Sequence, residues 1–309
     1  MALVVLIIVT LIVFFIMRLL PGDPLIIYMG QSAQLQAMSP EQIEELRHRF
    51  GLDQTLVVQY FNWIGGIFKG DFGESINYHE KVSTLLAERL PVTIYIGAIS
   101  LIFGSIIGVA IGLWAGVKRA KWPDRIITPL TYIGIAIPVF WLGILMIYLF
   151  ALQLKWLPTS GWTSPFDDFV LSTRKIIMPV ICMSLFSIAA NARQMRSSIL
   201  ETVGQDYIRT AWSKGLSERI VIFRHAMKNS LIPVITLIGM GVGSILAGSV
   251  LIETVFSIPG VGRLLVSSIF GQDYTVVQAI TLMMSVSILV MNLLVDLSYG
   301  WFDPRIRYG

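Results

Sequence analysis

The chain has 309 residues and a net charge of +4, with 55% hydrophobic residues, only 14% charged residues and a mean hydropathy of +0.74. A soluble domain carries about a quarter charged residues, and here the deficit is concentrated in blocks, which indicates an integral membrane protein. The single cysteine, Cys182, excludes an intrachain disulfide.

Six uncharged runs have the length and composition of membrane-spanning helices, or come close to it. A helix needs about 20 apolar residues to cross the hydrocarbon core, and it satisfies its own backbone hydrogen bonds there. The sequence therefore predicts an all-α integral membrane protein with six transmembrane helices. The runs are Met1–Met17, Leu90–Val117, Ile126–Leu154, Ile176–Ala192, Leu231–Ile252 and Val276–Val295.

The first run has neither a basic start nor a small-residue cleavage site, so we interpret it as a retained span and not as a signal peptide. Six spans place both termini on the same side of the membrane. Lysine and arginine are denser in the connections at 118–125 and 193–228 and in the C-terminal tail than in the other connections. The positive-inside rule therefore predicts that both termini are cytoplasmic.

A polar block at residues 21–90 separates the first span (residues 1–20) from a core at residues 91–309. We expect this block to fold as a small helical extracytoplasmic subdomain. Ser39 reads as the N-cap of one helix, with proline at its first position, and Gly51 ends that helix. A second helix is expected to follow, burying one face. That face consists of Leu56, Tyr60, Trp63 and Phe68.

Glycines recur every four residues in the second run and mark one face of that helix. A face without side chains lets another helix approach closely, so we expect it to pack against a partner helix in this chain or in another subunit. Pro138 and Pro233 are expected to bend the third and fifth spans. The stripe consists of Gly104, Gly108, Gly112 and Gly116.

No catalytic, nucleotide-binding or metal-binding constellation is present in the sequence. A P-loop requires Gly-Lys followed by Ser or Thr, and the chain has no Gly-Lys dipeptide. Its histidines lie in separate segments outside the runs. Among ionisable residues only Asp296 lies at the edge of a run, one turn after Asn292; an interfacial role is favoured over a role in a transport pathway. We therefore expect no enzyme activity, no metal and no cofactor on this chain. Because the runs hold few ionisable residues that could use an ion gradient, the energy for its function must come from elsewhere.

The connection at residues 193–229 is the most informative segment. A helix-favouring stretch ends at Gly215, where we expect a positive φ, and a second short helix from Glu218 to Met227 returns to the membrane. Such a helix–turn–helix is a rigid projection suited to a groove on another protein, although a plain amphipathic surface helix is the alternative. The residues of this projection are Asp206, Tyr207, Arg209, Thr210, Ala211, Ser213, Lys214, Gly215 and Leu216.

Ala211 and Gly215 match the coupling loop of ATP-binding cassette importers, whose pattern is Glu-Ala-Ala, three residues and Gly. Arg209 and Thr210 depart from that pattern in the manner of the peptide-importer branch, which favours an Arg-Thr-Ala-x-x-Lys-Gly-Leu run. Over nearly its whole length the chain resembles permease subunits of the dipeptide, oligopeptide and nickel branch. The other motifs that carry this resemblance are Arg18–Pro24, Gly70–Gly73 with Ser75, Leu90–Thr93, Glu253–Phe256 with Pro259 and Gly260, and Asp303–Tyr308.

The resemblance implies a type I importer permease fold in the bacterial cytoplasmic (inner) membrane and a binding-protein-dependent peptide importer. The importer would be completed by a second homologous permease, two ATP-binding cassette ATPases and an extracytoplasmic solute-binding protein. ATP and Mg would bind to the ATPases, and no nucleic acid is expected as a partner. The segment at 206–216 would be the coupling helix. Ala211 would be small because it packs against the ATPase, and the subdomain at 21–90 would face the binding protein.

Other functions stay open at this point. A nickel or metallophore importer of the same branch remains possible, because the selecting pocket lies mostly in the binding protein. A gradient-driven carrier or an intramembrane enzyme would belong to a different class, and either would need ion pairs or a catalytic dyad inside the spans. A purely structural scaffold would not need a docking projection.

Overall fold

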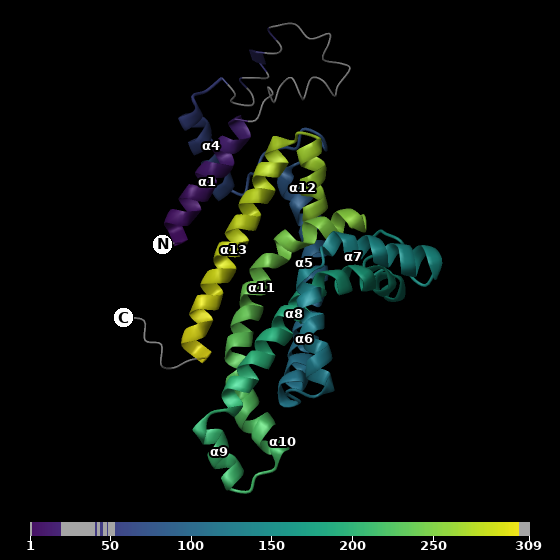
Figure 1. The fold of residues 1–309 in the computed structure, drawn as a ribbon. Coiled ribbons are helices and arrows are strands. Elements are labelled where there is room, and N and C mark those ends of the chain that lie inside the picture. Colours follow the sequence, from purple (N-terminus) through teal and green to yellow (C-terminus); the bar gives the residue numbers. More distant parts are fainter. Residues whose placement is uncertain (1, 20–40, 42–43, 46–47, 49–52, 303–309) are drawn as a thin grey trace. The chain divides into compact units, whose positions relative to one another are not determined.

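The computed structural model describes residues 2–19, 41, 44–45, 48 and 53–302, and these residues form helices joined by short connections (Figure 1). The chain divides into two compact units, one of residues 1–92 and 260–289 and the other of residues 93–259 and 290–309. The helices are α1 (Ala2–Leu19), α4 (Leu56–Phe68), α5 (Val82–Val117), α6 (Trp122–Ala136), α7 (Val139–Met146), the π-helix η2 (Ile147–Gln153), α8 (Phe169–Val203), α9 (Asp206–Ser213), α10 (Glu218–Ile220), the π-helix η3 (Val221–Ala226), α11 (Met227–Val255), α12 (Val261–Phe270) and α13 (Tyr274–Phe302).

In the first unit, α1 packs against α4 through aromatic side chains. Phe14 is fully buried, and its ring lies edge-on to Tyr60 with the centroids 5.4 Å apart and 5.9 Å from the ring of Trp63. The hydroxyl of Tyr60 is also 2.9 Å from Thr10 Oγ1, so this contact has both an apolar and a polar component. The expected second helix of the polar block is therefore present, and it uses two of its predicted apolar residues to contact the first helix.

The burial expected for the other two side chains of that face is wrong. Leu56 is 47% exposed and Phe68 is 86% exposed, because the contact with α1 is made by the middle turns of α4. The helix expected between Ser39 and Gly51 lies largely outside the described residues.

A buried carboxylate fastens the start of α13 to the loop that precedes α5. Asp273 is fully buried, and its Oδ2 accepts hydrogen bonds from Ser75 Oγ at 2.5 Å and from the Asn77 N–H at 3.1 Å. In the same loop Gly73 has φ +83°, and a Cβ built on it would lie 2.8 Å from Thr275 Cγ2. The Gly-Asp-Phe-Gly motif and the serine after it thus have a structural role within this unit.

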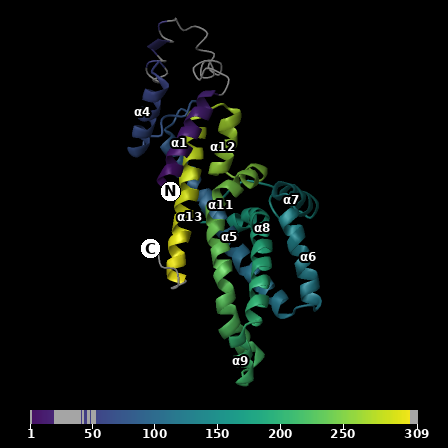
Figure 2. The same ribbon diagram turned by 60° about the vertical axis from the view of Figure 1, so that its left-hand side comes forward.

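The second unit is a helix bundle in which α8 lies between α6 and α11 and packs against both (Figures 1 and 2). Helix α8 begins at Asp168, whose side chain accepts a 2.9 Å hydrogen bond from the Leu171 N–H as an N-cap. It then continues without interruption to Val203. Residues 193–203, which we expected in a connection, are therefore the last turns of this long helix.

The third apolar run is broken at Pro138, where a bend was expected. Helix α6 and the α7–η2 segment meet there at 101°. Proline disfavours the helical conformation for the residue before it, and Ile137 accordingly has ψ 124°. By contrast, α11 remains one helix through Pro233. The run that we expected to cross the membrane as one bent span is two helices at nearly a right angle.

Four of the described helices are long and apolar enough to cross a membrane, or five if the bent pair is one span. The expected first span corresponds to a shorter apolar helix, Val4–Phe15 within α1. The short helix expected to end at Met227 does not end there, because α10 and the π-helix η3 lead directly into α11. Helix α12 follows the fifth run and was not predicted, since its ten residues are too few to register as a span.

Candidate functional site

The partner of the glycine stripe is helix α8 of the same chain. A Cβ built on Gly108 would lie 2.8 Å from the carbonyl oxygen of Ile188, and one built on Gly112 would overlap the backbone of Ala192. The other two glycines of the stripe meet the same helix. Any side chain on this face would separate two helices whose backbones are in contact, so the stripe sets the distance between α5 and α8.

Helices α9 and α10 form a projection at one end of the second unit, beyond the ends of α8 and α11 (Figures 1 and 2). The turn between them contains Gly215, which has the positive φ expected, at +76°. A Cβ built on Gly215 would meet nothing within 4 Å. Glycine is therefore used here for its backbone conformation and not for a close contact.

The projection is attached to the bundle by a cluster of buried apolar side chains. Ile208 of α9 is fully buried and Ala211 is 7% exposed, and both pack with Ile199 of α8 and with Val221 and Ala226 of η3. The small size of Ala211 therefore has a reason within the chain, because this side chain packs in the cluster between α9 and the bundle; the predicted contact with an ATPase stays a prediction. The family pattern in this segment therefore includes residues on the inner face of α9 as well as residues on its exposed outer face.

The outer face of the projection is exposed and mostly polar, although it includes the large apolar side chains of Trp212 and Ile220. Tyr207 is 43% exposed, and its hydroxyl accepts a 2.7 Å hydrogen bond from Asn229 Nδ2. Arg209 NH1 lies 3.6 Å from Asp206 Oδ1, an exposed pair that contributes little to stability. The other exposed residues of the predicted segment are Thr210, Ser213, Lys214 and Gly215, whereas Leu216 is half-buried against the cluster.

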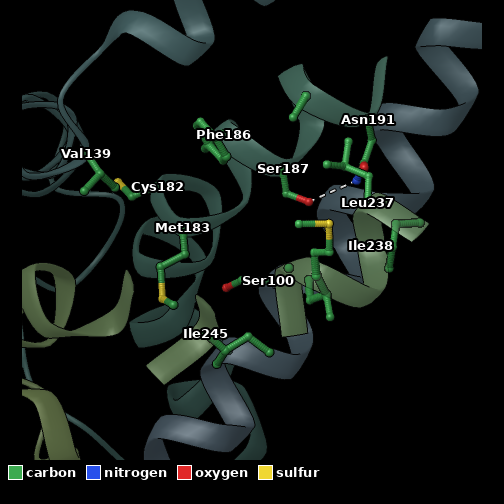
Figure 3. Close-up of a pocket in the computed structure, with 15 residues that line it drawn as sticks. Ser100, Val139, Cys182, Met183, Phe186, Ser187, Asn191, Leu237, Ile238 and Ile245 are labelled. Atoms are coloured by element: carbon green, nitrogen blue, oxygen red, sulfur yellow. Dashed lines mark hydrogen bonds between the residues drawn. The ribbon is translucent and has the colours of Figure 1, made fainter. Parts of the chain in front are cut away.

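A cavity of about 600 Å³ lies among α5, α7, α8 and α11 of the second unit (Figure 3). Its wall is mostly apolar, with Met183 and Phe186 among the larger side chains, and it includes three polar side chains, Ser100, Ser187 and Asn191. Asn191 Nδ2 donates a 3.1 Å hydrogen bond to Ser187 Oγ. The remaining lining residues are Gly97, Leu101, Val139, Cys182, Ala190, Leu237, Ile238, Met240, Gly241 and Ile245. Such a wall suits a solute with apolar parts and a few hydrogen-bonding groups.

Asn292, one of the two residues considered for a transport pathway, is not among the residues that line this cavity. Asn292 is exposed on α13, and the side chain of Asp296 lies outside the described residues. The spacing of Ser187 and Asn191, four residues apart in an apolar run, does place them on one helix face. Spacing alone could not reveal that this face meets a cavity. Among the described residues, no three His, Cys, Asp or Glu side chains form a group that could hold a metal ion.

Two sequence motifs meet at a second buried carboxylate. Glu253, near the end of α11, is 1% exposed, and its Oε1 accepts a 2.7 Å hydrogen bond from Thr93 Oγ1 of α5. Just after it, the carbonyl of Phe256 accepts a 2.8 Å hydrogen bond from the Gly161 N–H. The ring of Phe256 contacts α7, where a Cβ on Gly143 would lie 3.2 Å from it. The Leu-Pro-Val-Thr and Glu-Thr-Val-Phe motifs thus hold α5, α7 and α11 together.

Both parts of the sequence match known protein families. Residues 1–97 match the family described as the N-terminal part of a binding-protein-dependent transport system membrane component. Residues 108–308 match the family described as the binding-protein-dependent transport system inner membrane component. The second match covers the α9–α10 projection and most of the helix bundle, including the residues of α7, α8 and α11 that line the cavity.

Similar proteins agree with these matches. A peptide transport system permease protein of Brucella abortus is 41% identical over 308 residues, which are 99% of this chain and 96% of the relative. The di/tripeptide transport system permease protein of Pseudomonas aeruginosa is 36% identical over 97% of this chain and 94% of its own length. Among solved structures, an inward-facing form of the MetNI methionine ABC transporter aligns with a TM-score of 0.59 at 15% identity, covering 71% of this chain and 96% of the other. That likeness concerns the fold alone.

The apolar helices, the family matches and the full-length relatives are mutually consistent. The chain is a multi-pass inner-membrane protein that belongs to the family of binding-protein-dependent transport system inner membrane components, the permease subunits of ATP-binding cassette importers.

Proposed function

We propose that this chain forms half of the translocation pathway of an ATP-driven importer of di- or oligopeptides. The observation that carries the proposal is the α9–α10 projection, which has a buried inner face anchored to the bundle and an exposed, mostly polar outer face. A rigid element of this kind is suited to transmit motion from a separate motor subunit. The peptide substrate is supported by the names of relatives that align over nearly the full chain.

The assembly that follows from this proposal has four further proteins. A second homologous permease would complete the pathway, two ATPase subunits would bind and hydrolyse ATP with Mg, and a solute-binding protein would deliver the substrate. Closure of the ATPases would move the coupling helices, and the two permeases would rock against each other to alternate access. The cavity between α5 and α11 would form part of the pathway wall, accepting the apolar side chains of peptides while Ser187 and Asn191 offer hydrogen bonds.

In the proposed topology six segments cross the membrane, with both termini and the α9–α10 projection in the cytoplasm. The density of lysine and arginine in the connections at 118–125 and 193–228 supports this orientation. Residues 21–90 would then lie outside, where the binding protein docks. Cysteine-accessibility labelling from each side of sealed vesicles tests the arrangement; labelling of Ser213→Cys and Glu74→Cys from the same side would contradict it.

The coupling role is tested with substitutions on the exposed face of α9. Arg209→Glu and Thr210→Trp change side chains that contact nothing in the cluster, so the projection should stay folded. In proteoliposomes that contain the whole importer, both variants should assemble normally but lose substrate-stimulated ATP hydrolysis and peptide uptake. Arg119→Glu, an exposed change in the short connection between α5 and α6, is the matched control and should transport normally. Wild-type transport by both α9 variants would refute the coupling role.

A further inference from the structure

The second unit contains a partly buried ion pair that none of the roles above uses. Asp124, in the first turn of α6, is 6% exposed, and Arg196 lies near the end of α8. The guanidinium binds the carboxylate in a two-pronged manner, with Nε 2.5 Å from Oδ1 and NH2 3.0 Å from Oδ2. This geometry requires arginine, because the compact ammonium of lysine cannot make two parallel hydrogen bonds.

The carboxylate of this pair is fully occupied by donors. Asp124 Oδ2 also accepts a 2.9 Å hydrogen bond from the Ala120 N–H, and Oδ1 accepts a 3.0 Å hydrogen bond from Thr128 Oγ1. The first of these closes the corner between α5 and α6, where Ala120 has a left-handed φ of +61°. One side chain in the first turn of α6 therefore binds both the corner and α8. A negative charge in the first turn is also favoured by the helix dipole.

Burying two charges costs desolvation free energy that their attraction often only offsets, so a buried pair is weak evidence for stability. What such a pair does impose is a single geometry, since a shift of either helix would separate the charges and leave both unsatisfied. The pair thus makes the α6–α8 register strict where apolar packing would tolerate sliding.

The position of the pair links it to the α9 projection. Arg196 lies one turn before Ile199, the α8 member of the cluster that holds α9. At the same level the backbone of α5 is pressed against α8, since a Cβ on Gly116 would overlap Ile199 and lie 3.3 Å from the Arg196 carbonyl. Helix α9 itself packs against α8 and η3. Motion of α9 therefore has two routes into the bundle, one through η3 into α11 and one through the turns of α8 that the ion pair holds.

We propose that Asp124 and Arg196 are positioning residues for energy coupling: their ion pair locks the α5–α6 corner to the end of α8, so that α9 and the bundle move as one body. This inference rests on the coupling role of α9 proposed above. If the lock is lost, displacement of α9 is absorbed by sliding between α6 and α8. ATP binding then no longer changes access to the pathway.

The test compares three single variants, one double variant and one control in the reconstituted importer. Asp124→Asn and Arg196→Gln each break the pair, and Arg196→Lys keeps the charge but loses the two-pronged contact. Substrate-stimulated ATP hydrolysis and uptake should fall at least about fivefold in the first two, the low end of coupling between distant sites, and by less in Arg196→Lys. The double variant Asp124→Asn/Arg196→Gln should lose no more than either single one, because both remove one interaction. The neighbouring exposed Arg125→Gln is the control and should behave as wild type.

A spectroscopic measurement separates coupling from a general loss of structure. Spin labels on Arg119→Cys and Ser213→Cys, in a Cys182→Ala background, report the distance between the α5–α6 corner and α9. In the complex with an intact pair we expect one narrow distance distribution with and without ATP, and Asp124→Asn should broaden it only when ATP is bound. Additive losses, or a distribution in Asp124→Asn identical to that of the intact pair, would overturn the positioning role. If the pair variants transport normally while Arg209→Glu does not, only this inference fails; normal transport in all of them removes the coupling role of α9 itself.

Discussion

The glycine stripe on α5 and the glycine in the α9–α10 turn use the same residue type for opposite reasons. Gly112 has an ordinary helical backbone, but its position has no room for a Cβ because the backbone of α8 lies against it. Gly215 has ample room, with nothing within 4 Å of a built Cβ, but its φ of +76° is one that other residues adopt only at a cost. A substitution at the first position fails through sterics between elements, and one at the second fails through local backbone strain. The difference predicts distinct phenotypes.

The largest effect is expected for Gly112→Leu. The new side chain must push α5 away from α8 along the entire stripe, and overpacking of this kind costs about 1–3 kcal/mol or more. We expect loss of most folded protein, measured as the fraction of monodisperse complex recovered in detergent. Gly112→Ala should already lower recovery, because even one Cβ overlaps the backbone of Ala192. Recovery of both variants at wild-type levels would contradict the close packing of the stripe.

At Gly73 a substitution would meet both a steric clash and left-handed backbone strain, so this position allows the two contributions to be measured separately. It has φ +83°, and a Cβ there would lie 2.8 Å from Thr275 Cγ2. Gly73→Ala should cost about 2 kcal/mol, part from left-handed strain and part from the contact. Thr275→Ser removes the offending methyl group, so the double variant should recover only the steric part. Thermal unfolding of the four proteins of this cycle measures the coupling; full additivity would remove the steric contribution.

Substitutions at Gly215 should be milder for the fold. Gly215→Ala is expected to cost about 1 kcal/mol, and Gly215→Asn less, because asparagine tolerates the left-handed region. Gly215→Val adds β-branching and should lower coupled ATP hydrolysis while the complex still assembles. Ala211→Glu is a different case: it would bury a charge in the cluster that anchors α9 and should detach the projection. If Gly215→Asn and Gly215→Val had equal effects, backbone strain would not be the reason for glycine here.

The smallest effect, and one of opposite sign, is expected at Gly65. This residue lies inside α4 and has neither a positive φ nor an atom within 4 Å of a built Cβ. Gly65→Ala should therefore stabilise the first unit by about 0.5 kcal/mol through the lower entropy of the unfolded chain. A measurable loss of stability in detergent would mean that α4 is covered by another protein at this point.

The sequence by itself was sufficient for the features that depend on local composition and backbone preference. Uncharged runs located the long helices, the residue before Pro138 set the break, and Gly215 marked a turn with positive φ, because each effect acts within a few residues. The helix-favouring stretch before Gly215 likewise identified the segment that forms the α9–α10 projection. Family motifs then linked that segment to the coupling role proposed for it.

Only the tertiary structure decided what each face meets. Periodicity places Ala211 and the glycine stripe on helix faces, but it carries no information on whether a face meets another helix, a partner or lipid. Here both faces meet the same chain. The Asp124–Arg196 pair joins residues 72 positions apart, and the cavity is assembled from four helices, so neither leaves a pattern in any one segment. Such features arise from the packing of helices distant in sequence, and side-chain spacing within a helix does not encode the neighbour on the other side.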